Sequence, residues 1–216
     1  MTTNNRNYQK EMEKIIQGFD GERKSLLLHS CCAPCSSAVL EKLQEVFEIT
    51  VFYYNPNISE DTEYRKRVEE QKRLIEAFNL KNPEYPIKMI DGDYEPQEFY
   101  EISKGWETCP EGGERCFKCY ALRLEKTAHM AREGEYDYFT TTLTISPLKN
   151  AGKLNEIGEE MAVKYQTAFL PSDFKKKEGY KRSIELSKEY DLYRQNFCGC
   201  AFSKAESLKR EKESQS

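Results

Sequence analysis

The sequence predicts an α/β fold in which a parallel sheet carries helices on both faces. Short apolar runs, each of the length of one buried strand, alternate along the chain with longer segments of helical character. At 216 residues the chain is long enough for one full hydrophobic core, and no repeat, low-complexity tract or linker divides it. We therefore expect an N-terminal helical extension over 1–24, one α/β metal-binding catalytic domain over 25–203 and a charged tail over 204–216.

The predicted strands are apolar runs that stop abruptly at charged or turn-forming residues. The first run follows a charged stretch, and the second ends at Asn55, Pro56 and Asn57, residue types that favour a turn. The five predicted strands cover residues 25–30, 51–54, 87–90, 138–143 and 168–170.

The predicted helices carry apolar residues at helical spacing or begin with a residue suited to a first turn. Met12, Ile15 and Ile16 share one face of the first helix, and Pro34 stands in the first turn of the second, where proline is well tolerated. We expect the charged end of the chain, from 203 onward, to fray. The predicted helices span residues 1–20, 33–47, 61–79, 97–104, 116–132, 154–163 and 177–190.

Composition and cysteine content point to a reducing compartment. No apolar run approaches the roughly 20 residues that span a bilayer, and the first residues lack the apolar stretch of a secretory signal, so we expect a cytoplasmic protein without membrane contact. Thiols stay reduced there, so the eight cysteines indicate metal binding or redox chemistry rather than disulfides. The net charge of −4 argues against indiscriminate coating of nucleic acid but allows a local basic patch.

The first cysteine group, Cys31, Cys32 and Cys35, lies where the first predicted strand turns into a helix. Ligands of parallel α/β proteins bind beyond the carboxyl ends of the strands, so the loops after the first, second and fourth strands are the expected site. Nucleotide-binding folds of this kind carry a glycine-rich phosphate loop at this turn. Here thiols replace the glycines, and a helix N-terminus lowers the pKa of a thiol as readily as it holds a phosphate.

Two further groups complete the predicted metal site. Cys116 and Cys119 open a helix on one face, and Cys198 and Cys200 flank a glycine that permits a tight turn. A lone pair of this kind also suits zinc or thioredoxin-like chemistry, but seven thiols in three groups exceed the four ligands of one zinc ion. They suit an iron–sulfur cluster with thiols left over. The predicted metal ligands are Cys31, Cys32, Cys35, Cys116, Cys119, Cys198 and Cys200, with Cys109 a spectator.

Five short motifs follow one another along residues 25–203. They are HSCCAPCSS at 29–37, YYNPNI at 53–58, EGGERCFKCY at 111–120 followed by Arg123 and Leu124, TTLTISP at 141–147, and YRQNFCGC at 193–200. In this order they resemble the motifs of the cobalamin-independent epoxyqueuosine reductases of the QueH type.

The resemblance implies an iron–sulfur oxidoreductase that reduces epoxyqueuosine, at the wobble position of tRNA, to queuosine. It also implies a fold similar to adenine-nucleotide hydrolase-like (HUP) domains, a [4Fe-4S] cluster, a second, mononuclear iron close to it, and no cobalamin. Reducing an epoxide to an alkene takes two electrons and two protons and releases the oxygen as water. Because a cluster passes single electrons, an external electron donor must act twice. An open iron site would ease carbon–oxygen cleavage as a Lewis acid.

The thiols divide between the two metal sites in a way that the sequence only partly fixes. The cluster ligands are expected to be Cys116 and Cys119, one of Cys31 and Cys32, and one of Cys198 and Cys200. Cys35, with one neighbouring thiolate, is then predicted to hold the second iron, and Cys35 and Cys32 are the predicted catalytic residues. Members of the family differ at the position of Cys35, where some carry aspartate.

Predicted contacts to the tRNA come from basic residues and one amide. They are Asn55, Arg115, Arg123, Arg194, Lys175, Lys176 and Lys177. The three lysines neighbour Phe174 and Tyr180, so this segment could pair phosphates and stack bases, although a solvated helix face explains it equally well.

Two alternatives stay open at this point. A metal-binding tRNA-modifying protein without reductase activity would share the cysteines, and an ATP-independent relative of the tRNA sulfur-transfer enzymes would share the fold. An ATP-using enzyme of that group should carry a glycine-serine phosphate loop, which Cys31–Cys35 replaces here.

Several polar residues are candidates for lesser roles. His29 is expected to orient the cysteine loop, and His129 to lie on the surface or in the core. No proton donor can be chosen, because the four candidates near predicted strand ends are also ordinary loop residues. These candidates are Tyr54, Asp91, Asp93 and Asp173.

Overall fold

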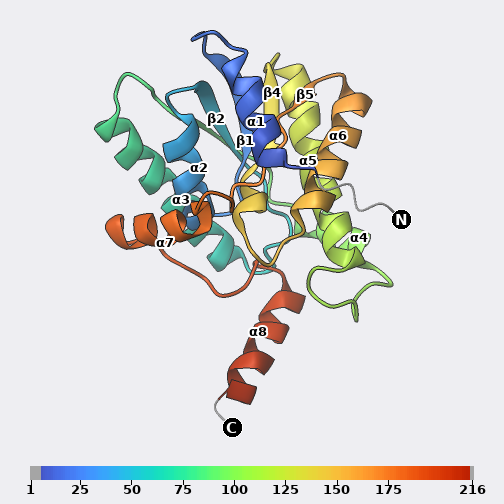
Figure 1. The fold of residues 1–216 in the computed structure, drawn as a ribbon. Coiled ribbons are helices and arrows are strands. Elements are labelled where there is room, and N and C mark those ends of the chain that lie inside the picture. Colours follow the sequence, from blue (N-terminus) through green and yellow to red (C-terminus); the bar gives the residue numbers. More distant parts are fainter. Residues whose placement is uncertain (1–5, 215–216) are drawn as a thin grey trace.

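Five parallel strands form the centre of the computed structural model, which describes residues 6–214 (Figure 1). In order across the sheet, they are β3 (Lys88–Asp91), β2 (Phe47–Tyr53), β1 (Lys24–His29), β4 (Tyr138–Thr141) and β5 (Ala168–Phe169). Strands β1 and β4 are neighbours in the sheet. The connection that follows β1 leads to one face of the sheet, and the connection that follows β4 leads to the other. In such sheets the crevice outside the carboxyl ends of these two strands is where ligands bind.

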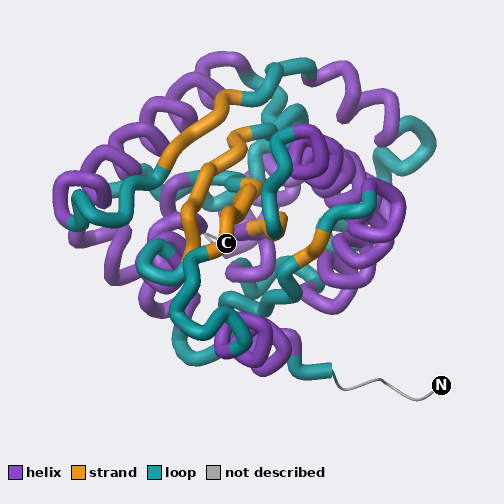
Figure 2. The backbone as a smooth tube through the Cα atoms, turned by 90° about the horizontal axis from the view of Figure 1, so that it is seen from above, coloured by secondary structure: helices purple, strands orange, loops and turns teal. Residues whose placement is uncertain are grey.

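Helices cover both faces of the sheet, as Figure 2 shows from above. Side chains of β1 alternate between the two cores: Leu26 and Leu28 pack with one set of helices, and Leu27 packs with the other. The first set is α1 (Tyr8–Gln17), α2 (Ala33–Leu43), α3 (Asp61–Lys81) and α7 (Gly179–Glu189), and the second is α5 (Glu114–Glu133) and α6 (Ala151–Tyr165). The predicted α/β fold with a parallel sheet is therefore confirmed.

Several predicted boundaries are wrong. The second helix ends at Leu43 instead of 47, because Phe47 is already the first residue of β2 and is fully buried. The fourth strand ends at Thr141 rather than 143, because the Thr141 hydroxyl accepts a hydrogen bond from the backbone N–H of Leu143 at 3.1 Å. That bond begins the 3₁₀ helix η1 (Thr142–Ile145).

The last predicted helix begins two residues late in the structure. Lys177 and Glu178 adopt left-handed backbone conformations, with φ of 50° and 60°, so α7 begins only at Gly179. A Cβ atom at Gly179 would lie 1.9 Å from the carbonyl oxygen of Phe174, so glycine is required at this turn.

The end of the chain is helical, which corrects the expected fraying. Helix α8 (Ala201–Ser214) projects from the body at the same end as the cysteine loops (Figure 1). Its first turn is attached by Glu206, whose carboxylate accepts from the backbone N–H of Glu111 at 3.1 Å and pairs with Arg115 at 3.4 Å. Lys204 also pairs with Glu60, at 2.5 Å.

The remaining helix, α4 (Pro96–Ser103), packs against α5 close to its predicted place. The first helix, predicted over 1–20, is shorter: it begins at Tyr8, where Asn7 caps it, and ends at Gln17, while 1–5 lie outside the described residues. Within residues 6–214, no helix is both long and apolar enough to cross a membrane.

Candidate metal centre

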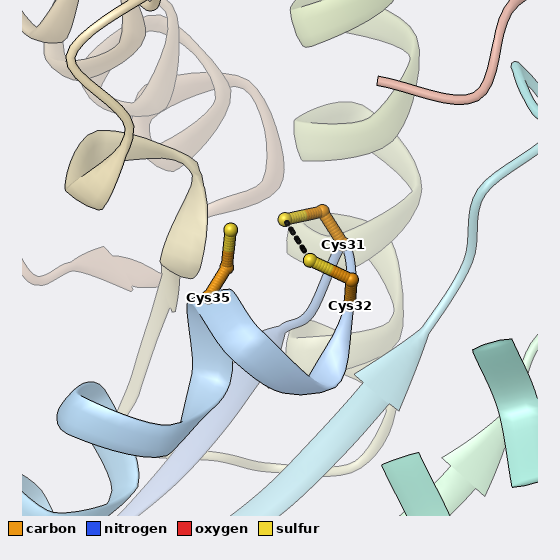
Figure 3. A group of neighbouring side chains, drawn as sticks. All are labelled: Cys31, Cys32 and Cys35. Carbon is orange, nitrogen blue, oxygen red and sulfur yellow. Dashed lines mark hydrogen bonds between the residues drawn. The ribbon is translucent and has the colours of Figure 1, made fainter. Parts of the chain in front are cut away.

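Three thiols meet at the carboxyl end of β1. The Sγ atoms of Cys31, Cys32 and Cys35 all lie within 4.8 Å of one another, and those of Cys31 and Cys32 are 3.8 Å apart (Figure 3). Cys32 is the residue before the first turn of α2, and Pro34 occupies that turn. Because α2 starts here, Cys35 comes round one helical turn later on the same face. We call these three residues the strand-end trio.

Within the strand-end trio, Cys31 is favoured as the thiolate, and Cys32 and Cys35 are favoured as thiols that donate hydrogen bonds to it. Hydrogen bonds from Cys32 and Cys35 hold the pKa of Cys31 well below its usual value. The contact with Cys31 raises the pKa of Cys32 to about 12, and it raises the pKa of Cys35 well above its usual value. A bound cation would displace the two remaining protons, since thiolates rather than thiols ligate metals.

A polar network fixes the backbone beneath the trio. The Ser30 hydroxyl lies 2.6 Å from that of Ser36, and both donate to the side-chain oxygen Oε1 of Gln71. The expected role of His29 in orienting the cysteine loop stays a prediction: its Nδ1 lies 2.9 Å from the Thr141 hydroxyl and its Nε2 3.1 Å from the Tyr54 carbonyl oxygen. It thereby connects β1 to β4 and to the end of β2.

Four of the other five thiols surround a small cavity between α5 and the 198–200 turn. Cys116 and Cys119 come from the first two turns of α5, and Cys198 and Cys200 from the turn, with 3.6 Å between the last two Sγ atoms. Gly199 has φ of +114°, and a Cβ atom there would lie 2.7 Å from Ile58. Only glycine therefore lets both cysteines of the turn face the cavity. We call this set the helix-start quartet.

The quartet, like the trio, contains one acidic thiol. A hydrogen bond from Cys200 holds the pKa of Cys198 well below its usual value, while burial raises the pKa of Cys116 and Cys119. The sulfur atoms of Cys116 and Cys200 accept from the backbone N–H groups of Gly112 at 3.2 Å and Ser203 at 3.3 Å, respectively. Such bonds stabilise thiolates.

The thiols group differently from the mixed sets inferred from sequence. The structure gathers the trio by itself, and it gathers Cys198 and Cys200 with the pair on α5. Cys198 also lines a larger cavity with the trio, so the two sets are adjacent. Cys109 lines neither cavity and lies beside Gly113 in a loop.

The larger cavity has a volume of about 250 Å³ and opens to the surface. Thiols of the trio lie on one side, and residues of η1 and the following turn form an apolar wall. The cationic side chains around it are Arg67, Arg123, Lys149 and Arg194. The only carboxylate among its lining residues is Glu111. We call this space the cysteine cleft.

Two cations of the cysteine cleft were not among the predicted site residues. Arg67, on α3, is 2% exposed; it pairs with Glu63 and donates to the Cys198 carbonyl oxygen at 3.1 Å. Nothing in the charged sequence of α3 sets it apart from its neighbours. Lys149 stands two residues after the TTLTISP motif, and that proximity was the one available signal.

The predicted arginines occupy three different settings. Arg123 is 3% exposed, lines the cleft and donates to the Asn55 side-chain oxygen at 3.3 Å; Asn55 in turn donates to the Ser30 carbonyl oxygen. Arg194 lines the cleft near Tyr180 and is held by the Ser187 hydroxyl at 3.1 Å. Arg123 and Asn55 therefore support the cleft from beneath.

Arg115 is 2% exposed and lies outside the cleft. Its guanidinium donates to the carbonyl oxygens of Trp106, at 3.1 Å, Glu107, at 3.0 Å, and Cys109. Arg115 therefore holds the 106–109 loop in place, and the Arg115 side chain itself is buried.

The predicted lysines and acids lie outside the cleft. Lys175 pairs with Asp173 at 2.9 Å and Lys177 with Glu13 at 2.6 Å. None of the four earlier candidates for a proton donor, Tyr54, Asp91, Asp93 and Asp173, lines either cavity. His129 is on the surface of α5, 3.4 Å from Glu133.

Comparisons with known proteins agree on one family. The family model described as epoxyqueuosine reductase QueH matches residues 26–206. Proteins named epoxyqueuosine reductase QueH are similar to the chain: that of Staphylococcus epidermidis is 45% identical over 91% of this chain and 84% of its own length. That of Staphylococcus aureus is 42% identical over 91% and 83%, and that of Haemophilus influenzae 40% identical over 88% and 75%.

Proposed function

Because the chain belongs to the epoxyqueuosine reductase QueH family, and so converts epoxyqueuosine to queuosine in tRNA, we propose that its two thiol sets hold the metal centres of this reaction. The helix-start quartet would bind a [4Fe-4S] cluster and the strand-end trio a mononuclear iron. The observation that carries the proposal is the position of Cys198, which lines both the quartet's cavity and the cysteine cleft.

The residues present fit these groups. Thiolates about 2.3 Å from one tetrahedral metal ion lie roughly 3.8 Å apart, and the Cys31 and Cys32 sulfur atoms are separated by 3.8 Å. A [4Fe-4S] cluster takes four thiolate ligands, the number that the quartet supplies. Lys149 and Arg123 line the same small cavity and offset the negative charge that four thiolates bring.

The protein's own residues would bind and orient the substrate. When bound, the metal centres would supply single electrons from an external donor and a Lewis acid for the epoxide oxygen. The apolar wall formed by Leu143, Ile145 and Pro147 would exclude water from the cyclopentane ring of the substrate. Arg194 and Tyr180 also line the cleft. The Arg194 guanidinium is suited to the anionic backbone of an RNA loop, and the Tyr180 ring is suited to stacking on one of its bases.

The sheet topology supports a proposal about the wider class of folds to which this domain is similar. The strand order 3-2-1-4-5, with the site between β1 and β4, supports a likeness to adenine-nucleotide hydrolase-like domains. In such domains the turn after the first strand commonly holds phosphate, and here the trio occupies it. Reduced thiols in both sets further support work in a reducing compartment, the cytoplasm.

The test is anaerobic reconstitution with iron and sulfide, followed by an assay on tRNA that carries epoxyqueuosine. We expect about four sulfides and more than four irons per chain, and conversion to queuosine with a chemical reductant but without cobalamin or ATP. One zinc ion in place of iron, or turnover that depends on ATP or cobalamin, would refute the proposal. A loaded protein that binds the tRNA but never reduces it would favour a modification role without reductase activity.

A further inference from the structure

Two cations, Arg123 and Lys149, line both the cysteine cleft and the cavity of the helix-start quartet. Of these two, Lys149 is the one whose side chain has no hydrogen-bond or ion-pair partner among residues 6–214. Its backbone is fixed, because its N–H donates to the Ser146 carbonyl oxygen at 3.2 Å and the next residue, Asn150, caps α6. The side chain is therefore presented from a rigid turn at the carboxyl end of β4. That turn faces the trio across the topological switch point of the sheet.

The ammonium of Lys149 lacks the partners that its neighbours have. Arg67 pairs with Glu63, Arg123 donates to Asn55, and Arg194 is held by Ser187. Across residues 6–214, by contrast, the Lys149 ammonium makes no hydrogen bond or ion pair. The half-buried Lys149 ammonium therefore has donor hydrogens available for an oxygen atom or anion bound in the cleft.

A lysine side chain is ordinarily charged at neutral pH. The lysine ammonium carries three donor hydrogens on a flexible side chain, so it can keep a hydrogen bond to an oxygen atom that moves away during the reaction. The guanidinium groups of the arginines are held by their own partners and cannot move in this way. Lys149 is thus better suited than Arg67 or Arg123 to contact a reacting oxygen.

We propose that Lys149 is a catalytic residue whose ammonium donates a hydrogen bond to the epoxide oxygen and stabilises the charge that develops there. This inference rests on the proposed function. In the balanced reaction, two electrons arrive from the external donor, both carbon–oxygen bonds break and a carbon–carbon double bond forms. The oxygen takes two protons from solvent and leaves as water.

The test compares Lys149→Met and Lys149→Arg with the wild type and with Lys153→Met; Lys153 is a lysine of α6 that pairs with Glu156 and lines neither cavity. Each protein is loaded anaerobically and assayed for iron, sulfide, affinity for epoxyqueuosine-tRNA and single-turnover rate after prereduction. Lys149→Met should keep its metal content and its tRNA affinity while its rate falls about 100-fold or more, the loss typical of one removed donor to a developing oxyanion. Lys149→Arg should recover part of that rate, and Lys153→Met should match the wild type.

Other outcomes overturn the inference in distinguishable ways. A Lys149→Met protein with the wild-type rate would exclude a contact to the reacting oxygen. Loss of iron and sulfide in proportion to the rate, in both Lys149 variants, would make Lys149 a counter-ion of the thiolates instead. A fully loaded wild type that leaves epoxyqueuosine-tRNA unreduced would overturn the proposed function, and this inference with it.

Discussion

At the scale of single residues, substitutions in the two thiol sets are expected to have different effects on metal content and activity. Cys35→Ser removes one ligand from the trio and should spare the cluster's absorbance but abolish epoxide reduction. Cys119→Ser removes a ligand from the quartet and should lose both, because a cluster with three thiolates is readily lost. Anaerobic absorbance spectra, iron and sulfide content, and turnover measure the two effects.

Cys109→Ser is the matched control for these substitutions. Cys109 lines neither cavity, so its loss should change neither the spectrum nor the turnover. Loss of the cluster in Cys35→Ser would show that the trio and the quartet are one site, and unchanged turnover would show that the trio holds no catalytic metal.

The sequence predicted the residues of the site better than their arrangement. The seven cysteines predicted as metal ligands do lie in two adjacent sets, since Cys198 of the quartet also lines the cysteine cleft beside the trio, and their role as ligands stays a prediction. Their division differed, because sequence spacing shows that Cys116 and Cys119 share a helix face but not which distant pair faces them. Arg67 was missed for the same reason: its contact with the Cys198 carbonyl joins residues 131 positions apart.

At the scale of whole elements, β1 and β4 are connected at their amino ends by Asp137. Its carboxylate accepts from the backbone N–H of Ser25 at 2.8 Å and from the Ser25 hydroxyl at 2.7 Å. The hydroxyl bond, followed by the backbone bond, lowers the pKa of Asp137. A carboxyl group with a lowered folded pKa stabilises the protein above its unfolded pKa and loses that effect as pH falls.

We therefore expect Asp137→Asn to lower the free energy of unfolding by about 1 kcal/mol at pH 7. The unfolded pKa is near 3.8, so the difference from wild type should shrink as pH falls through and below that value. Urea unfolding at several pH values measures it. A constant difference at all pH values would mean that the carboxylate charge does not contribute. Glu48, exposed on the neighbouring strand β2, provides the control substitution, Glu48→Gln.

Helix α8 holds the 106–109 loop through Glu206 and Arg115. Glu206→Ala should remove the acceptor of the Glu111 N–H and the partner of the Arg115 guanidinium. We expect a loss of about 1–2 kcal/mol in the free energy of unfolding. We also expect faster tryptic cleavage after the exposed Lys104, which limited proteolysis would show.

Glu213→Ala, near the far end of the same helix, is the control for Glu206→Ala. Glu213 is exposed and lies 3.9 Å from Lys209, at the limit of an ion pair, so its removal should have no effect. Equal cleavage rates in the two variants would show that α8 does not hold the loop.

The strands and α8 differ in how far the sequence could predict them. Leu26, Leu27 and Leu28 form an apolar run, and their burial on both faces confirms the strand that it predicted. Helix α8 was missed because its charged sequence offers little apolar surface. What anchors it is a small number of contacts to distant residues, such as Glu111 and Glu60, which no local pattern shows.

At the scale of the whole molecule, the basic segment Lys175–Lys177 lies apart from the cysteine cleft. Changing all three lysines to alanine should weaken tRNA binding and flatten its dependence on salt, provided that they pair with phosphates. The metal content and the single-turnover rate at saturating tRNA should stay unchanged, since no lysine of the segment lines the cleft. Filter binding at several salt concentrations measures the slope.

An unchanged salt slope would assign Lys175 and Lys177 to their ion pairs with Asp173 and Glu13 alone. Lys10→Ala, an exposed lysine of α1, is a suitable comparison for the loss of one surface charge. A slope that flattens equally in Lys10→Ala would reflect net charge rather than contact with the RNA.

The two thiol sets draw on segments that lie far apart in the sequence, since Cys31 follows β1 and Cys198 follows α7. Neither the cavity of the quartet nor the cysteine cleft is complete until the turn that carries Cys198 has packed against the rest of the fold. Metal binding and folding are therefore coupled in this protein, because the full set of thiols exists only in the folded chain. Thiols that have not yet been brought together remain open to oxidants and competing metals, so assembly depends on a reducing environment.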